Sequence, residues 1–245
     1  LTNMESADYA SATLSLNYPA SEGLHKAIQR VTEEAGAAVK SGTTILVLSD
    51  RDIAEDKLPI HAALATGAVH HRLIKAGLRC DTNIIVETAT TRDSHHFAVL
   101  LGYGATAIFP YLAYESINGL IERKEIAESD RFKLAKNYRK GINKGLFKIL
   151  SKMGISTVAS YRGAQLFEIV GLNEEVADLC FTGSTCRIQG TKFEHIEADQ
   201  LILNKEAFNK RALIRQGGLL KFVHGGEYHA YNPDVVNSMQ AAVES

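Results

Sequence analysis

The sequence has little of what marks secreted, membrane-spanning or nucleic-acid-binding proteins. It has three cysteines in 245 residues, too few for a disulfide framework, which indicates a reducing compartment. No apolar run reaches the roughly 18 residues of a membrane-spanning helix, and no signal-peptide pattern opens the chain. A formal net charge of -1 gives no overall attraction to nucleic acid or anionic lipid. We therefore expect a cytoplasmic protein with neither a membrane nor a nucleic-acid partner.

Catalytic and phosphate-binding motifs are also missing. The sequence contains no G-x-S-x-G and no Walker-type lysine loop. Gly102, Gly104 and Ala107 fit G-x-G-x-x-A, but they follow a predicted helix and precede a predicted strand, the reverse of a dinucleotide site, so we interpret them as a helix C-cap. Cys180 and Cys186 lack the third nearby thiolate of a cluster. We predict no catalytic, cofactor-binding or metal-binding residue in this chain.

Two histidine pairs could suggest a metal site, but their spacing argues against one. His70 and His71, like His95 and His96, are neighbours on predicted helices, where side chains point about 100° apart. Asp93 is a good N-cap, so His95 and His96 should lie in the first turn of their helix. His71 falls on the apolar face of a helix that begins at Pro59 and ends at Gly77, with a face formed by Ile60, Ala63, Leu64, Gly67, His71 and Ile74. We predict that His71 is a hydrogen-bonded core histidine.

Four short β-branched runs predict the fold class. They are apolar throughout their centres, which is typical of parallel strands covered on both faces, and they span residues 43–50, 83–90, 106–113 and 154–160. Helical patterns separate them, so we predict an α/β fold with right-handed crossovers.

The carboxyl ends of parallel strands meet at one edge, where ligands of α/β proteins usually bind. We therefore predict a common rim formed by Ser49, Asp50, Arg51, Glu87, Thr88, Tyr111, Tyr161 and Arg162. An equally weighted alternative is that these polar residues only mark where the strands leave the core.

A predicted helix over residues 131–152 carries a regular charge pattern. Its apolar face consists of Tyr138, Ile142, Leu146, Ile149 and Met153. Lysines recur on it at every fourth position, and we call Lys136, Lys140, Lys144, Lys148 and Lys152 the lysine ridge. The ridge indicates a solvated face partly offset by Glu122, Glu125, Glu128 and Asp130. The alternatives are a surface for an acidic partner or for nucleic acid, and few aromatic residues interleave with the lysines to favour the latter.

Longer stretches resemble a known family. "IIVETATTRDSHHFAVLLGYGATAIFPYLAYESI", "NYRKGINKGLFKILSKMGISTVASYRGAQLFEIVGL" and "HGGEYHAYNPDVV" closely resemble, in this order, the central domain of the glutamate synthase large (alpha) subunit. The resemblance implies a degenerate or incomplete (β/α)8 barrel of the TIM type over residues 1–224. It implies that residues 225–245 form a linker toward an FMN-binding synthase domain.

The resemblance also implies a role without catalysis. In that family an amidotransferase domain releases ammonia from glutamine, and an internal tunnel leads it to a flavin domain that forms glutamate with 2-oxoglutarate. The central domain joins these two domains and helps to wall the tunnel. The implied partners are therefore the amidotransferase and FMN domains of the same parent polypeptide and, through the parent, a small electron-donating subunit or ferredoxin.

The departures from the family pattern concern its catalytic parts. The chain begins with Leu1 where the amidotransferase domain has its cysteine nucleophile, and the glycine-rich flavin segments are missing. Cys180 and Cys186 reproduce part of the cysteine spacing of the family's cluster, but Thr191 stands at the third position. FMN and an iron-sulfur cluster are thus implied for the parent enzyme and not for this chain. We interpret the chain as a domain fragment that is inactive alone.

Two other functions fit the sequence. The lysine ridge could serve a stand-alone binding module, or the predicted rim, with Asp50, Arg51, Glu87 and Arg162, could act on an anionic substrate in a small barrel enzyme.

Overall fold

The computed structural model describes residues 9–127, 130–211 and 217–244. The chain divides into two compact units, residues 1–204 and 205–245. This division comes earlier than the predicted end of the domain at residue 224, and the linker role of residues 225–245 stays a prediction. No helix in the described ranges is long and apolar enough to cross a membrane.

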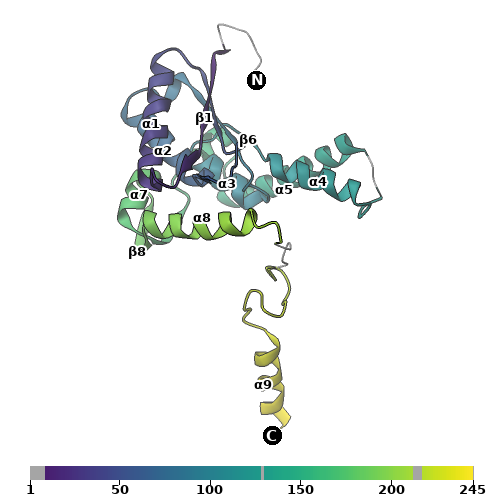
Figure 1. Cartoon of the computed structure of the whole chain (residues 1–245). Helices are drawn as coiled ribbons and strands as arrows, with labels where there is room; N and C mark the ends of the chain where they lie inside the picture. Colours follow the sequence, from purple (N-terminus) through teal and green to yellow (C-terminus); the bar gives the residue numbers. More distant parts are fainter. Residues whose placement is uncertain (1–8, 128–129, 212–216, 245) are drawn as a thin grey trace. The chain divides into compact units, whose positions relative to one another are not determined.

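A four-stranded parallel sheet forms the centre of the first unit (Figure 1). Its strands are ordered β1 (Ser11–Ser15), β3 (Ile45–Ser49), β5 (Asn83–Glu87) and β6 (Ala107–Phe109). Every residue of β3 is buried, as expected for a strand covered on both faces. Three of the four predicted strands are confirmed, and all pair in parallel.

The fourth predicted strand, residues 154–160, is wrong. Helix α6 (Val158–Tyr161) forms there, because the Thr157 side chain caps it by accepting a hydrogen bond from the amide of Ser160. Gly154, with φ of 68°, ends the preceding helix in the left-handed conformation. Local capping therefore outweighs the β-branched composition of this run.

Sequence analysis missed the strands outside these runs, and the one that belongs to this sheet, β1, lies at its edge. Its sequence SATLS is half exposed and has no continuous apolar run. It pairs with β3 over five positions, from Ser11 with Ile45 to Ser15 with Ser49.

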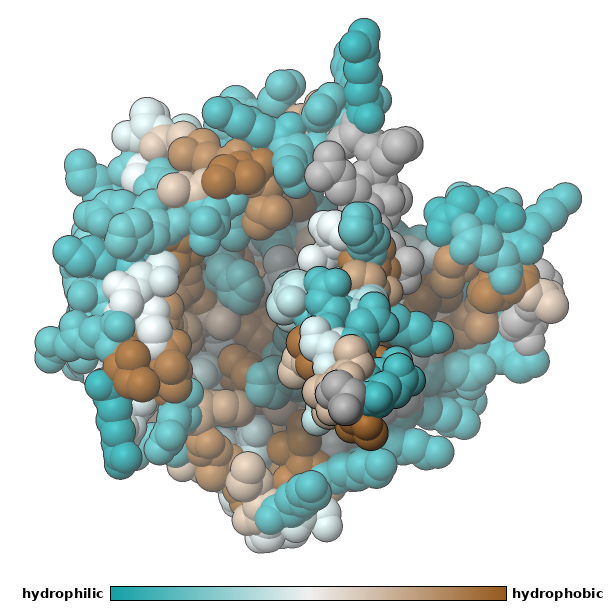
Figure 2. Space-filling view, turned by 90° about the horizontal axis from the view of Figure 1, so that it is seen from below, coloured by the Kyte–Doolittle hydropathy of each residue, from teal (hydrophilic) through white to brown (hydrophobic). Residues whose placement is uncertain are grey.

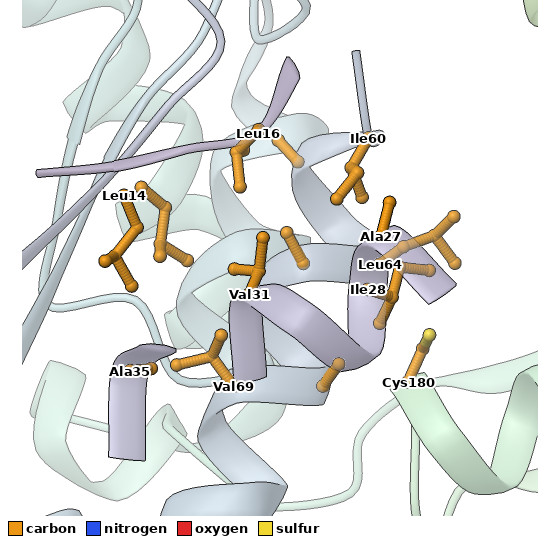
Figure 3. Packing of buried hydrophobic residues seen from close by; sticks show 14 of the residues in the cluster. Leu14, Leu16, Ala27, Ile28, Val31, Ala35, Ile60, Leu64, Val69 and Cys180 are labelled. Atoms are coloured by element: carbon orange, nitrogen blue, oxygen red, sulfur yellow. The ribbon is translucent and has the colours of Figure 1, made fainter. Parts of the chain in front are cut away.

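Helices α1 (Leu24–Lys40) and α2 (Ala62–Lys75) lie side by side and pack into the main core with α7 (Glu174–Cys180). Figure 3 shows side chains from these elements and from β1 pointing toward one another, among them Leu14, Ile28, Val69 and Cys180.

The predicted face of α2 is partly wrong. Pro59 ends strand β4 (Lys57–Pro59), which pairs with β2 (Asn17–Pro19), and the helix begins after His61. His70 is buried, whereas His71 is only partly buried and Ile74 is 50% exposed. Because α2 contacts both α1 and α7, its buried surface is wider than one stripe and is centred on other residues.

Helix α3 (Ser94–Gly102) agrees with the sequence analysis at both ends. The Asp93 side chain accepts hydrogen bonds from the amides of His95 and His96. Gly104, with φ of 115°, follows the helix and leads into β6, which confirms the C-cap interpretation.

Strands β7 (Glu168–Leu172) and β8 (Thr185–Thr191) form a separate parallel pair. Among the described residues, the parallel strands form one sheet of four strands and one sheet of two strands, and these do not close into a barrel. The fold is mixed α/β with parallel strands and connecting helices. Helix α8 (Phe193–Ala207) follows β8, and α9 (Pro233–Glu244) lies in the second unit.

Helices α4 (Tyr111–Glu122) and α5 (Arg131–Met153) form a pair that extends away from the sheet in Figure 1. All five lysines of the ridge on α5 are exposed, and none of them joins an ion pair with another described residue. Of the acids expected to offset it, Glu122 pairs with Arg131 and Glu125 with Arg123. Asp130 caps α5, and Glu128 lies outside the described residues.

The crossing of α2 and α7 yields a stability prediction. A Cβ on Gly67 would lie 1.9 Å from the carbonyl oxygen of Cys180, so Gly67→Ala should lower the free energy of unfolding by about 3 kcal/mol, the upper end for overpacked cores. Gly36→Ala, within α1, meets nothing within 4 Å and should raise it by about 0.5–1 kcal/mol. Urea denaturation measures both, and equal effects would contradict the described packing.

Candidate functional site

Asp50 lies directly after β3 and is almost fully buried, at 1% exposure. Its carboxylate accepts hydrogen bonds from the hydroxyl of Thr88 at 2.6 Å and from the amide of Ala89 at 3.0 Å. Its backbone amide donates to the carbonyl of Glu87, and its carbonyl accepts from the side chain of Asn17. One side chain thus ties the end of β3 to the turn after β5.

A second, more exposed set of contacts lies beside Asp50. The hydroxyl of Ser49 donates to the carboxylate of Glu87 at 2.5 Å, and Nε of Arg51 donates to the same carboxylate at 2.9 Å. Arg51 also lies 3.6 Å from Glu115, and its guanidinium stacks 4.4 Å from the ring centre of Tyr111. The Glu87 hydrogen bond raises the pKa of Arg51. Because the Arg51 side chain is 43% exposed, solvent screens this pair.

Tyr111 begins helix α4, and its ring lies against the Arg51 guanidinium. It is 6% exposed, and its buried hydroxyl makes no hydrogen bond of normal geometry with a described residue. Burial raises the pKa of Tyr111, and the charge of Asp50 raises it further. The hydroxyl therefore stays protonated, as a neutral polar group beside the buried carboxylate.

The structure thus brings together six of the eight predicted rim residues, namely Ser49, Asp50, Arg51, Glu87, Thr88 and Tyr111. The other two do not end a strand, so their predicted placement is wrong. Tyr161 belongs to α6 and packs against Ala98, Leu101 and Phe167. Arg162 follows α6, next to Gly163, whose amide bonds the carbonyl of Gly102 at the end of α3.

Next to the cluster the carboxyl edge opens into a recess of about 820 Å³. Strand β1 runs downward in Figure 1, and Figure 2 views the molecule from that side, where its surface is hollowed. The recess is lined by residues that precede or belong to α2 and α3, follow β5, or belong to α4 and α8. They are His61, Ala62, Ala63, Ala89, Thr90, Thr91, Arg92, His95, His96, Val99, Leu100, Leu112, Gln200 and Leu203. We call this cavity the edge recess.

The edge recess has histidines on its wall. His61 caps α2 by accepting a hydrogen bond from the amide of Ala63. Its side chain is exposed to the recess, and the many protein atoms around it reduce its hydration and lower its pKa, with a further lowering by the imidazole of His96. At neutral pH His61 is therefore uncharged.

Sequence analysis placed His95 and His96 correctly in a first turn but gave them no site. It missed His61, because the predicted helix began at Pro59. The described residues contain no group of three or more histidine, cysteine or carboxylate side chains that could hold a metal ion. The cysteines are free, and Cys180 is fully buried, which raises the pKa of its thiol.

Comparison with known proteins agrees with the resemblance noted above. Residues 1–173 match the family model described as "Glutamate synthase central domain". Similar proteins include a ferredoxin-dependent glutamate synthase of Arabidopsis thaliana, 44% identical, an NADPH glutamate synthase large chain of Bacillus subtilis, 39% identical, and an NADH glutamate synthase of Schizosaccharomyces pombe, 38% identical. These alignments cover 90%, 91% and 97% of this chain but only 14%, 15% and 12% of the relatives. The chain thus spans about one seventh of their length.

Among solved structures, the chain is similar to a variant of flavocytochrome b2 with sulfite bound. The sequence identity is 15% and the TM-score 0.41, and the match covers 63% of this chain and 39% of the other.

The buried carboxylate yields the second stability prediction. In Asp50→Asn the amide group brings two donors next to the Thr88 hydroxyl and the Ala89 amide, which both donate to Asp50 in the native structure. Losing charge-assisted hydrogen bonds in the core should lower the free energy of unfolding by about 2–3 kcal/mol. The control Glu115→Gln alters only an exposed partner of Arg51 and should stay within about 0.5 kcal/mol. Equal losses in urea denaturation would contradict the structural role of Asp50.

Proposed function

The chain belongs to the glutamate synthase central domain family, and on that premise we propose that it connects an amidotransferase domain and an FMN domain within a longer polypeptide. In the parent enzyme its edge recess forms part of the wall along which ammonia moves from glutamine to 2-oxoglutarate. The observation that carries the proposal is the position of the recess, at the carboxyl ends of the parallel strands and beside the hydrogen-bonded Asp50 cluster.

A conduit for ammonia requires walls that hold their shape. Asp50 and Thr88 are 1% and 0% exposed and bond each other, so they position the turn that carries Ala89 and Thr90 into the recess. Thr88 and Tyr111, two of the predicted rim residues, are buried and do not line the recess themselves.

The wall must also not protonate ammonia, because ammonium would be trapped. Carboxylic acids are absent from the described residues that line the edge recess. The lowered pKa of His61 keeps its imidazole neutral, so it has no proton to give up readily at neutral pH. The lining chemistry therefore suits passage of a small neutral base.

We assign no redox step to residues of this chain. FMN and an iron-sulfur cluster are proposed for the parent enzyme only, since Cys180 is buried as a protonated thiol and the described residues offer no set of cluster ligands. The relatives' names include ferredoxin, NADPH and NADH, and the similarity to all three is comparable. This favours a role common to all of them over one in binding the electron donor. The free thiols of Cys80, Cys180 and Cys186 fit the cytoplasmic or other reducing compartment that we propose for the parent.

The functional prediction concerns Thr90, which is exposed at the wall of the edge recess. In the full-length parent enzyme, Thr90→Trp should fill the recess, so that glutamine is hydrolysed without matching amination of 2-oxoglutarate. Thr90→Val is the matched control, because it keeps the volume and removes only the hydroxyl that contacts Thr88 at 3.1 Å. Coupled assays of glutamine consumed and 2-oxoglutarate aminated measure both. Full coupling in Thr90→Trp, with FMN bound and the rate unchanged, would exclude the recess as a conduit wall.

A further inference from the structure

A second cavity, of about 320 Å³, lies where α2 and α3 end and where β7 and β8 begin. It is therefore at the amino ends of the strands, away from the edge recess. Its lining is His70, His71, Ile74, Gly102, Tyr103, Gly163, Gln165, Phe167, Thr182, Gly183 and Ser184. We call it the amino-edge pocket. The lining combines hydrogen-bonding groups with apolar walls from Ile74 and Phe167, and it includes no carboxylate.

His70 presents a fixed donor to this pocket. Nε of Arg79 lies 2.9 Å from Nδ1 of His70, and because a guanidinium can only donate, Nδ1 must be the unprotonated nitrogen. The ring hydrogen of the neutral imidazole therefore sits on Nε2, the nitrogen nearer to Gly163. Burial, followed by the charge of Arg79, lowers the pKa of His70 to about 4, so this tautomer persists at neutral pH.

Two arginines near His70 form no ion pair with a carboxylate among the described residues. Arg79 is held by the backbone carbonyls of Thr82 and Gly104, at 2.7 and 2.8 Å. Arg162 is close enough to lower the pKa of Arg79, and its Nε is buried without a hydrogen-bond partner among the described residues. Neither arginine joins an ion pair with a described residue. Two positive charges thus act on His70 without a carboxylate partner among the described residues.

Backbone strain is located at the same pocket. Gln165 has φ of 52°, a left-handed conformation that costs a non-glycine residue free energy. Its side chain extends over Gly183, where an added Cβ would lie 2.6 Å from the Gln165 Nε2. This conformation keeps an amide group at the pocket wall. Lys124, at φ of 57°, is the other described non-glycine residue with positive φ, and it follows α4 far along the chain from the pocket.

The fold alone does not require this combination of features. A glycine at position 165 would remove the backbone strain, and a nearby carboxylate side chain would pair with the arginines. We propose that the amino-edge pocket binds a small organic carboxylate, which accepts hydrogen bonds from Nε2 of His70 and the side chain of Gln165 in the field of Arg79 and Arg162. The apolar walls from Ile74 and Phe167 fit the carbon skeleton of such a ligand better than an inorganic ion.

The test titrates the 245-residue chain with succinate and with its neutral analogue succinamide, at constant ionic strength, while backbone amides are followed by NMR. Succinate should shift the amides of Gly163, Gln165 and Gly183 in a saturable way, and succinamide should not. Arg162→Gln should weaken succinate binding about tenfold, because it removes a charge that favours the anion. Equal responses to the two compounds, or succinate shifts confined to the lysine ridge, would overturn the proposal.

A matched pair of variants separates binding from folding. Gln165→Gly should leave the melting temperature unchanged or raise it, because glycine accepts this φ, yet weaken succinate binding about fivefold through the lost amide. Lys124→Gly relieves the same kind of strain elsewhere and should leave the affinity unchanged. If Gln165→Gly is stable and binds succinate as tightly as the original chain, the pocket is not the carboxylate site.

Discussion

The buried carboxylate of Asp50 is the interaction on which the carboxyl edge depends. A carboxylate that leaves water costs several kcal/mol unless hydrogen bonds replace its hydration. The Thr88 hydroxyl and the Ala89 amide supply them, and both belong to the turn after β5. The requirement to satisfy one charge therefore fixes the relative position of two strand ends. Ala89 and Thr90, which line the edge recess, belong to this turn and are therefore held in place by the same hydrogen bonds.

The charged side chains at the two edges of the sheet are compensated in different ways. At the carboxyl edge, the charges of Asp50 and Glu87 are met by hydrogen bonds and by Arg51. At the amino edge, Arg79 is met by backbone carbonyls, and no described carboxylate compensates it or Arg162. The first arrangement is complete in the isolated chain and suits a rigid wall. The second is incomplete and suits a ligand.

The sequence predicted what depends on local patterns and missed what depends on tertiary context. Strands β3, β5 and β6 were predictable because burial on both faces requires continuous apolar runs. Residues 154–160 have a similar composition, but the caps at Gly154 and Thr157 make a helix. Arg162 therefore lies away from the rim. His61 could have been found from the cap it forms at α2, but Pro59 gave a stronger, misleading start signal. The pairing of Arg79 with His70 has no sequence pattern.

The central claim is that the edge recess is an internal surface of the parent enzyme. The most direct measurement is the maleimide labelling rate of a Thr90→Cys variant, made in a Cys80→Ser background because Cys80 is exposed. Labelling is followed by mass spectrometry in the 245-residue chain and in the full-length enzyme, each relative to its urea-unfolded form. The account predicts rapid labelling of the chain and strong protection in the full-length enzyme, where neighbouring domains cover the recess. Equal labelling of both native proteins would contradict it.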